Sequence, residues 1–543
     1  MKRRELFLLF TIGLLYYLGV SWSQRVPGYM DADYYFGGGL RLVQGHGFTE
    51  TVLWNYLDNP QSLPHPSHGY WYPLASIIAA AGMFIIGQQT FLAARLPFII
   101  IAALAAPISA SLGFRLTLNR GVAFTAGLLA VFGGYYSPFM GTTDNYAVFM
   151  VLGGLFFILI LSEQKLSFFF LGLVAGLLNL ARVDGIIWLF LAILGISIRF
   201  MSIPKPGLLL QSGRSQINID NKNSKFQRMQ VEKTGIHELV SPLILLILGY
   251  GLVMGPWMIR NYLIWQTPFT ASGSRVLWMT KYSDTFAWPA DRLNFQNWLA
   301  SGLKSAFLVR FNSLKLNLVN TIAAQFSFLL FPLVCLGIWR LRKELVTRLA
   351  VLQWLILFIL MSIIFPFAGA RGSFFHAAAG IMPVWYTAAV VGTDQIVSVN
   401  IYKMLHNKIS LWKSHSILIL FMFIISILLV RIAIVDRGWN DYQSSYENSE
   451  KILLQNGAQP SDVIMVSNSP GYFAINQRDS ITIPAENLKS IQSLAHKFGA
   501  KFLLLDSKYN SDLITEFASI PLIQDKFTLI GSLNDSQVYA IKP

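Results

Sequence analysis

The sequence has almost no cysteine and few charged residues. Cys335 is the single cysteine among 543 residues, so an intramolecular disulfide is excluded, and its apolar surroundings predict a core or lipid-facing position. Only 13% of the residues are charged, whereas 54% are hydrophobic. Soluble domains do not have this balance, and apolar runs of about 20 residues recur along the chain. The composition predicts a polytopic α-helical membrane protein.

Acidic residues are also scarce, which bears on the class of partner. The chain has 42 Lys and Arg against 27 Asp and Glu, for a net charge of +15. Residues 436–543 hold 12 acidic and 9 basic residues, so the positive excess lies in short segments between apolar runs. This is the positive-inside distribution of membrane proteins rather than a nucleic-acid-binding patch. No nucleic-acid partner is predicted.

The first residues, "MKRRELFLLFTIGLLYYLGVSWSQ", combine a basic start with an apolar run. The run is about 17 residues long and lacks a clear small-x-small cleavage site. It predicts an uncleaved first transmembrane helix with a cytoplasmic N-terminus.

Twelve apolar segments are candidates for crossing the membrane. If all twelve cross, the basic clusters after residues 199, 340 and 403 fall outside; if 71–87 does not cross, they fall inside. We therefore expect 71–87, with Tyr70, Trp71 and Tyr72 at its start, to lie at the outer interface. This leaves about eleven spans and an external C-terminus. The segments centre on 6–22, 71–87, 95–114, 121–137, 146–161, 167–181, 185–199, 241–262, 318–339, 348–366, 377–397 and 414–435.

The last hundred residues have a different pattern. "DVIMVS" (462–467) and "KFLLLD" (501–506) are typical of short buried strands, and "AENLKSIQSLAHKFG" (485–499) has helical periodicity. A membrane domain over 1–435 and a small external α/β domain over 436–543 are predicted. The α/β part has no GxGxxG or P-loop pattern, so we assign it no cofactor and expect a cap or docking module.

Three carboxylates lie where the chain is predicted to leave the membrane on the outer face. Asp31 and Asp33, in "PGYMDADYYFGGG", follow the first apolar segment, and Asp144, in "TTDNY", opens a later helix. Asp33 and Asp144 are also placed to cap helices, so this structural role stays open. Carboxylates that converge from separate loops can serve as a general base, as cation ligands or as acceptor clamps.

Histidines and arginines accumulate on the same predicted face. His65 and His68, in "PHPSHGYWYP", have no third ligand nearby, so loop polarity or a substrate contact is favoured over a metal. Arg260, Arg371 and His376 lie at predicted external helix ends. Arginine pairs bidentately with phosphate, although at a bilayer surface it is often an anchor. These five residues are the candidates for binding substrate.

Together these stretches resemble bacterial GT-C glycosyltransferases, the relatives of protein O-mannosyltransferases and of the lipid A aminoarabinose transferase. "MDADYYFGGGLRLVQGHGFTE" is similar to the first external loop of these enzymes, and "YWYPL" to the entry of the next juxtamembrane helix. "ARVDG" (181–185) and "GPWMIRNYLIWQTPF" resemble recurrent stretches, although Arg182 and Asp184 in the first can simply neutralise each other. The layout covers most of 1–400, and the order of the motifs is the stronger signal.

The resemblance implies an external cavity beside the bilayer of a bacterial inner membrane. There a sugar would move from a polyprenyl phosphate to a lipid, glycan or protein acceptor. The acid after the first helix corresponds to Asp31, with Asp33 close enough to compete for the role, and the second-loop acid to Asp144. The external arginine corresponds to Arg371, although "RGSFFH" departs from the commoner "RY" pattern. Asp31 would be the base of an inverting single displacement. Some relatives use a divalent cation, but no cofactor is predicted here.

Two other classes stay open: a transporter or flippase, and a polymerase or ligase that uses lipid-linked oligosaccharide. A transporter would place its essential polar groups near the bilayer midplane, and we find no fixed-period repeat or paired broken helices. A glycosyltransferase would gather them at the outer membrane edge around Asp31. Asp31 and Asp144 on opposite sides of the membrane would exclude the proposed mechanism.

Overall fold

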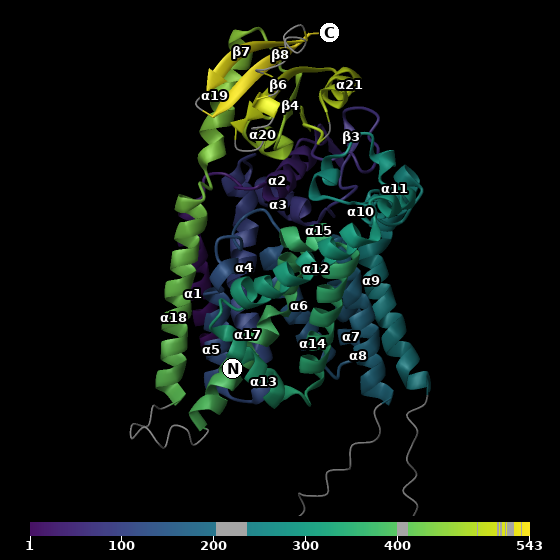
Figure 1. Ribbon diagram of the computed structural model, residues 1–543. Helices are drawn as coiled ribbons and strands as arrows, with labels where there is room; N and C mark the ends of the chain where they lie inside the picture. The colour runs from purple at the N-terminus through teal and green to yellow at the C-terminus, as the bar shows by residue number, and fades with distance from the viewer. Residues whose placement is uncertain are drawn as a thin grey trace, which may run out of the picture.

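The protein is a long helical bundle with a small sheet domain at one end (Figure 1). The computed structural model describes residues 1–201, 236–398, 411–485, 487–507, 510, 513–515, 517, 526–533 and 535–542. Most of the basic loop expected over 199–238 and the expected cationic residues Lys403 and Lys408 lie outside the described residues.

All twelve predicted apolar segments are helices, which confirms a helical polytopic protein. Among the described residues, seven helices are long and apolar enough to cross a membrane, and α12 and α13, which meet at a 93° bend, make an eighth if counted as one span. The other four are apolar helices of 10–17 residues: α3, α5, α6 and α7. The helices of the bundle are α1 (Arg3–Trp22), α4 (Phe91–Thr117), α5 (Arg120–Val131), α6 (Tyr146–Ile160), α7 (Leu166–Ala181), α8 (Ile186–Met201), α9 (Ile236–Trp265), α12 (Leu303–Asn320), α13 (Leu330–Leu341), α14 (Leu345–Ile359), α15 (Pro366–Ala368), α16 (Phe374–Ala378), α17 (Met382–Ser398) and α18 (Leu411–Arg431).

Small residues let the helices of the bundle approach closely. A Cβ atom added at Gly13 of α1 would lie 3.2 Å from the Ala103 backbone of α4. At Gly153 of α6 it would overlap the backbone of Gly380, in the short helical turn η8 (Ala379–Ile381). Small residues at such crossings are typical of membrane helices, where packing replaces the hydrophobic effect. The Gly153–Gly380 crossing also brings the chain after Asp144 against the chain after His376.

The short helices α2 (Met30–Val43) and α3 (Leu74–Ile86) lie at the end of the bundle next to the sheet domain (Figure 1). Helix α3 has 13 residues. At 1.5 Å per residue it is about 20 Å long, which is less than the ~30 Å hydrocarbon core. Helices α5, α6 and α7 are short as well, so length does not distinguish 71–87 from the segments predicted to cross, and its interfacial position stays a prediction. The same end carries α10 (Gly273–Val276) and α11 (Phe295–Ala300).

The sheet domain combines the C-terminal region with one strand from the first external loop. The predicted strands and helix are confirmed as β4 (Val463–Val466), β6 (Ala500–Asp506) and α21 (Leu488–Phe498). Five of the six strands come from 436–543; the sixth, edge strand β2 (Val52–Leu53), pairs in parallel with β5. The strand order in the sheet is β2, β5 (Ser480–Thr482), β4, β6, β8 (Ser536–Ile541) and β7 (Phe527–Leu533). Helices α19 (Asp441–Gln455), α20 (Ser469–Asn476) and α21 lie around it. Strand β1 (Thr49–Glu50) pairs separately with β3 (His65–Pro66).

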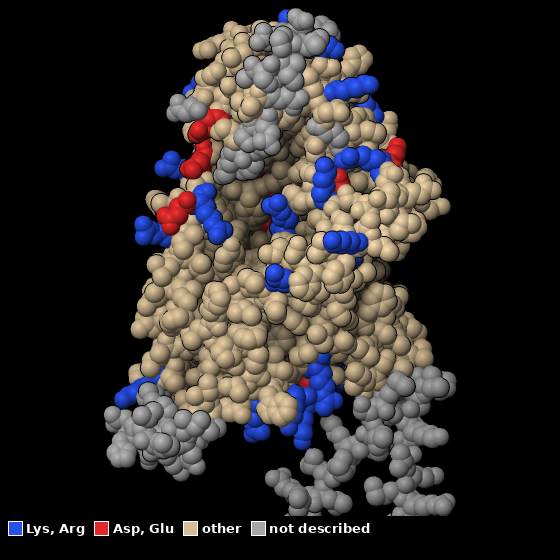
Figure 2. Space-filling model, viewed as in Figure 1, with Lys and Arg blue, Asp and Glu red and all other residues tan. Residues whose placement is uncertain are grey.

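Lys and Arg side chains are seen at both ends of the molecule, whereas the Asp and Glu side chains in view lie mostly at the end with the sheet domain (Figure 2). Lys and Arg side chains gather at the end opposite the sheet domain, where the α13–α14 turn lies (Figure 2). That turn carries Arg340, Arg342, Lys343 and Arg348. On the viewed side, the surface is hollowed between the sheet domain and the bundle, with basic side chains around the recess (Figure 2).

Candidate functional site

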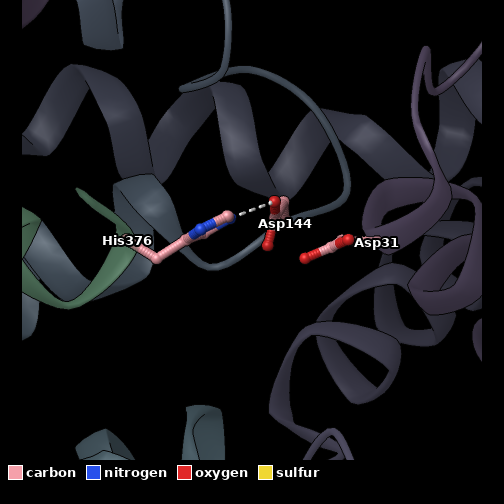
Figure 3. A group of neighbouring side chains, drawn as sticks. All are labelled: Asp31, Asp144 and His376. Atoms are coloured by element: carbon pink, nitrogen blue, oxygen red, sulfur yellow. Dashed lines mark hydrogen bonds and ion pairs between the residues drawn. The ribbon is translucent and has the colours of Figure 1, made fainter. Parts of the chain in front are cut away.

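Asp31, Asp144 and His376 converge from three separate parts of the chain (Figure 3). Asp31 lies in the first turn of α2, Asp144 in the loop before α6, and His376 in α16. One possible ligand atom from each residue lies within 4.8 Å of the other two. Three of the eight predicted site residues therefore form one cluster.

The environment of Asp31 suits a proton acceptor. The half-buried carboxylate stands at the N-terminus of α2, where the helix dipole favours negative charge. Burial, and then the nearby charge of Asp144, raise the pKa of Asp31 to about 6. A carboxylate with this pKa is largely ionised at neutral pH but accepts a proton more readily than an ordinary aspartate.

The pKa of Asp144 is shifted in the opposite direction from that of Asp31. Burial opposes its ionisation, but His376 and hydrogen-bonding partners outweigh burial and lower the pKa of Asp144. The Tyr29 hydroxyl donates to Oδ2 at 2.6 Å, and His376 Nε2 lies 3.0 Å from the same oxygen. The backbone N–H of Asn145 donates to Oδ1 at 2.6 Å. Neighbouring carboxylates whose pKa values are pushed apart are typical of separate acid–base and electrostatic roles.

Both ring nitrogens of His376 face oxygen atoms. Nε2 faces Asp144, whereas Nδ1 lies 3.1 Å from the carbonyl oxygen of Gly372 and 3.2 Å from the Tyr146 hydroxyl. The ring stacks on Tyr146 with a centroid distance of 3.9 Å. An imidazolium donates from both nitrogens, and a neutral ring that donates from Nδ1 leaves Nε2 free to bind a cation.

Arg182 is a cation beside this cluster that was not among the predicted site residues. It donates to both carboxylate oxygens of Asp184 at 3.0 and 2.9 Å, which confirms mutual neutralisation, and to the carbonyl oxygen of Ser373 at 3.3 Å. Its charge also lowers the pKa of Asp31, although less than burial raises it. The "ARVDG" motif was the available signal, but only the fold shows that it contacts the segment before His376.

Arg371 is the exposed cation of the same segment. It lies in η7 (Gly369–Ser373), where Gly372 has a positive φ of 127°, and its guanidinium sits 4.1 Å from the ring centroid of Tyr282. Burial raises the pKa of Tyr282, on which the charges of Arg371 and Asp31 also act. Arg371 makes no hydrogen bond or ion pair with any residue that the structure describes. Its fork of donors is available to a ligand.

Asp33 lies away from the cluster. Two residues correspond to about 200° around a helix, so Asp33 faces the C-terminal domain rather than Asp144. It is fully buried, and it accepts hydrogen bonds from the Tyr442 hydroxyl at 2.6 Å and from Asn468 Nδ2 at 3.1 Å. Burial raises the pKa of Asp33 to about 7.

The two histidines of the first external loop have partners within that loop or on α3. His65 Nε2 lies 2.7 Å from Asp58 Oδ2. His68 is buried between the hydroxyls of Ser67, 2.7 Å from Nδ1, and Ser76, 3.0 Å from Nε2. Burial, and then the charge of Arg260, lower the pKa of His68 to about 3. Neither histidine joins the three-residue cluster.

Arg260 also braces the first external loop. Its Nη2 donates to the carbonyl oxygens of Phe48 at 3.0 Å and Ser67 at 2.9 Å. The guanidinium lies over the rings of Trp257 and Trp265, at 4.5 and 4.8 Å from their centroids. Nη1 donates to Asn261 Oδ1 at 3.2 Å, so both terminal nitrogens of Arg260 have partners, in contrast to those of Arg371.

Known proteins resemble this chain in fold but not detectably in sequence. No family model matches the sequence, and no curated protein matches it either. Among solved structures, the oligosaccharyltransferase of Archaeoglobus fulgidus tethered to an acceptor peptide aligns with a TM-score of 0.57 at 13% identity, covering 100% of this chain and 74% of that one. The oligosaccharyltransferase AglB from Archaeoglobus fulgidus, in complex with an inhibitory peptide and a dolichol-phosphate, aligns with a TM-score of 0.54 at 13% identity, covering 96% of this chain and 72% of that chain.

The second similarity covers both chains almost completely. ArnT from Cupriavidus metallidurans bound to undecaprenyl phosphate aligns with a TM-score of 0.57 at 9% identity, over 98% of this chain and 97% of that chain. Both neighbours are GT-C glycosyltransferases with polytopic membrane domains and an external domain. The chain described here shares the fold of these two GT-C glycosyltransferases.

Proposed function

We propose that the protein transfers a sugar from a polyprenyl-phosphate-linked donor to an acceptor hydroxyl at the outer face of a bacterial inner membrane. The observation that carries this proposal is the convergence of Asp31, Asp144 and His376 at the end of the bundle next to the sheet domain. The fold shared with ArnT, which was solved with undecaprenyl phosphate, supports a lipid-phosphate donor. The basic α13–α14 turn at the opposite end supports a cytoplasmic assignment for that end.

Asp31 is the base in this proposal. A hydroxyl is a weak nucleophile, and a carboxylate within hydrogen-bond reach can take its proton as it attacks. The acceptor oxygen forms a bond to the anomeric carbon, the bond between that carbon and the phosphate oxygen breaks, and the proton moves to Asp31. Polyprenyl phosphate leaves with the bonding electron pair. One displacement from the opposite face inverts the anomeric centre.

Arg371 stabilises the leaving group in this proposal. The phosphate gains negative charge as the glycosyl bond breaks, so a cation fixed at that position lowers the barrier. Arg371 suits this role because it is exposed and unpaired within the described part of the chain, and a guanidinium fork binds phosphate oxygens bidentately. Arg182 already donates to Asp184 and to the carbonyl oxygen of Ser373. It therefore contributes its positive electrostatic field to the site rather than hydrogen bonds to the phosphate.

A second role for the same three residues is to bind a divalent cation. Two carboxylates and an imidazole whose donor atoms lie within 4.8 Å of one another match the ligand preferences of Zn²⁺ or Mn²⁺. Asp31, Asp144 and His376 Nε2 would hold the ion, and His376 would keep its Nδ1 hydrogen bond to Gly372. Such an ion supplies Lewis-acid polarisation of a bound oxygen.

A second candidate function uses an oligosaccharide instead of a single sugar as the transferred group. The likeness to the archaeal oligosaccharyltransferase favours this reading, because its complexes hold an acceptor peptide and, separately, a dolichol-phosphate. The location of the acidic cluster argues against a transporter, whose essential polar groups belong near the midplane.

The test is sugar release by the purified protein in lipid, from a panel of radiolabelled polyprenyl-phosphate sugars and one lipid-linked oligosaccharide. Wild type is compared with Asp31→Asn and with Asp462→Asn, which alters a buried aspartate in the sheet domain. We expect Asp31→Asn to lose turnover by at least 100-fold with donor binding retained, and Asp462→Asn to keep it. Unchanged turnover in Asp31→Asn would reject Asp31 as base, and absence of donor binding by wild type would reject the function.

A further inference from the structure

The chain that enters the sheet domain contacts both sides of Asp31. After α18, Trp439 Nε1 donates to the carbonyl oxygen of Val26 at 3.0 Å. The Tyr442 hydroxyl accepts the backbone N–H of Gly28 at 3.1 Å and donates to Asp33 Oδ1 at 2.6 Å. Gly28 lies three residues before Asp31 and Asp33 two residues after it, so one hydroxyl bridges the turn that carries the proposed base.

The fit between these segments requires a glycine. Gly28 has a φ of +100°, and a Cβ atom there would overlap the indole ring of Trp439. The ring can therefore lie directly against the backbone that leads into α2. Asn440, the residue after Trp439, holds the chain just before Gly28. Its Oδ1 accepts a hydrogen bond from the backbone N–H of Arg25 at 2.8 Å, and its Nδ2 donates to the carbonyl oxygen of Ser23 at 3.0 Å. The connection from α1 to α2 is thus held along its length.

The same segment reaches the second carboxylate. Tyr29 packs edge to face on Trp439, with a centroid distance of 5.6 Å, and its hydroxyl donates to Asp144. Trp439 therefore supports the donor that orients Asp144, while Tyr442 supports the turn that carries Asp31. Both supports come from a stretch of four residues, 439–442, that leads from the end of the last membrane helix into the first turn of α19 in the sheet domain.

We propose that Tyr442 is a positioning residue, which holds Asp31 in its catalytic geometry by bridging Gly28 and Asp33. This inference rests on the proposed glycosyl transfer and extends it, because it makes the C-terminal domain a structural part of the catalytic site. A side chain held from both sides of its own turn keeps a fixed direction, and small misplacements of a catalytic group lower turnover strongly. Asp33 also helps to position Asp31, because it accepts the hydrogen bonds that Tyr442 and Asn468 donate.

The primary test compares Tyr442→Phe with Tyr472→Phe. Tyr472 is buried in α20 and donates its hydroxyl to Glu450 Oε2 at 2.9 Å, so its variant also loses a tyrosine–carboxylate hydrogen bond, but within the sheet domain. We expect Tyr442→Phe to lower kcat at least tenfold with the donor KM within twofold of wild type, and Tyr472→Phe to change neither. Equal losses in the two variants, or none in Tyr442→Phe, would overturn the inference.

Amide hydrogen exchange over residues 25–36 gives a readout that needs no substrate. We expect faster exchange in this peptide for Tyr442→Phe and wild-type exchange for Tyr472→Phe. If wild type transfers no sugar from any donor, the proposed function fails, and the exchange comparison still decides whether Tyr442 holds the turn. Wild-type exchange in Tyr442→Phe would reject the positioning role in either case.

A paired exchange of side chains tests the second support. Asp33 accepts from two donors, the Tyr442 hydroxyl and Asn468 Nδ2, whereas an asparagine offers one acceptor oxygen, so in Asp33→Asn one of the two donors faces the new NH2 group. The double variant adds Asn468→Asp. The NH2 group introduced at position 33 then donates to the carboxylate introduced at position 468, and this carboxylate still accepts the backbone N–H of Gly471. We expect the single variant to lose at least fivefold in kcat and the double variant to recover most of it. No recovery, with both proteins folded, would contradict a positioning role for this pair.

Discussion

Nη2 of Arg95 lies 2.6 Å from Oε1 of Gln24, in a buried junction between α4 and the chain that leaves α1. Arg95 also donates to the backbone carbonyls of Ser21, Gln24 and Gly141. It therefore ties the segment before Asp31 to the loop before Asp144. No carboxylate pairs with Arg95 within the described part of the chain. Carbonyl and amide oxygens compensate its burial, together with the Phe91 ring, whose centroid lies 4.7 Å from Cζ of Arg95.

Replacement of Arg95 should destabilise the protein. Arg95→Met leaves several buried acceptors without a donor, which costs about 1–3 kcal/mol for each group that water cannot reach. We expect thermal unfolding in detergent to shift down by several degrees, and Arg95→Lys to recover only part of the loss, because an ammonium lacks the planar fork. Arg115→Met, at an exposed position of the same helix, is the control. A wild-type melting temperature for Arg95→Met would contradict this account.

The pH dependence of transfer should report Asp31. A base must be ionised, and the pKa of Asp31 is raised to about 6, so activity is full above this pH and falls as Asp31 takes up a proton below it. We expect kcat/KM to be half-maximal near pH 6 and to fall about tenfold per pH unit well below it. The lowered pKa of Asp144 keeps that residue ionised through this range. A half-maximal point near pH 4 would point to a base in an ordinary environment.

The cluster should bind one Mn²⁺ per chain. Equilibrium dialysis of the purified protein measures this directly, without a substrate. Asp144→Asn and His376→Ala should each weaken binding at least tenfold, because each removes one of three donors. His65→Ala is the control, since His65 pairs with Asp58 outside the cluster. Equal binding by all four proteins would show that the ion binds elsewhere.

Stability should fall in acid partly because of His68. Its pKa is lowered to about 3 in the folded protein, whereas an unfolded histidine titrates near 6.5. Above about pH 6.5 neither state is protonated; below it only the unfolded state gains a proton, so the contribution of His68 to stability is lost as pH falls towards 3. We expect His68→Asn to show a shallower loss of melting temperature between pH 6.5 and 4.5 than wild type. Parallel curves would mean that another group controls this range.

The sequence predicted the helical membrane domain well, because long apolar runs leave few alternatives. It also predicted β4, β6 and α21, whose alternation and periodicity are local properties. It did not predict β2, since a two-residue strand has no pattern of its own and exists only by pairing with Ser480 and Ile481. The bend between α12 and α13 was likewise hidden inside one apolar segment, 318–339.

The candidate site was predictable in part for a similar reason. Asp31 and Asp144 stood out because carboxylates at predicted membrane edges are costly and conspicuous. Asp31 and Asp33 could not be separated, because they are two residues apart in a segment whose helical phase was unknown. The structure gives them opposite faces of α2, with Asp33 held by Tyr442, 409 positions later. Sequence spacing does not reveal a partner at that distance.

The parallel pairing of β2 with β5 has a consequence for biosynthesis. Residues 52–53 are made early, but their partners Ser480 and Ile481 are made much later. The early loop must therefore stay unpaired while more than 400 further residues are synthesised, and contacts of such long sequence separation form slowly. Asp33 of α2 likewise depends on Tyr442 and Asn468, which are made long after it. The first helices therefore reach the membrane-insertion stage before the partners that complete the candidate site around Asp31 have been made.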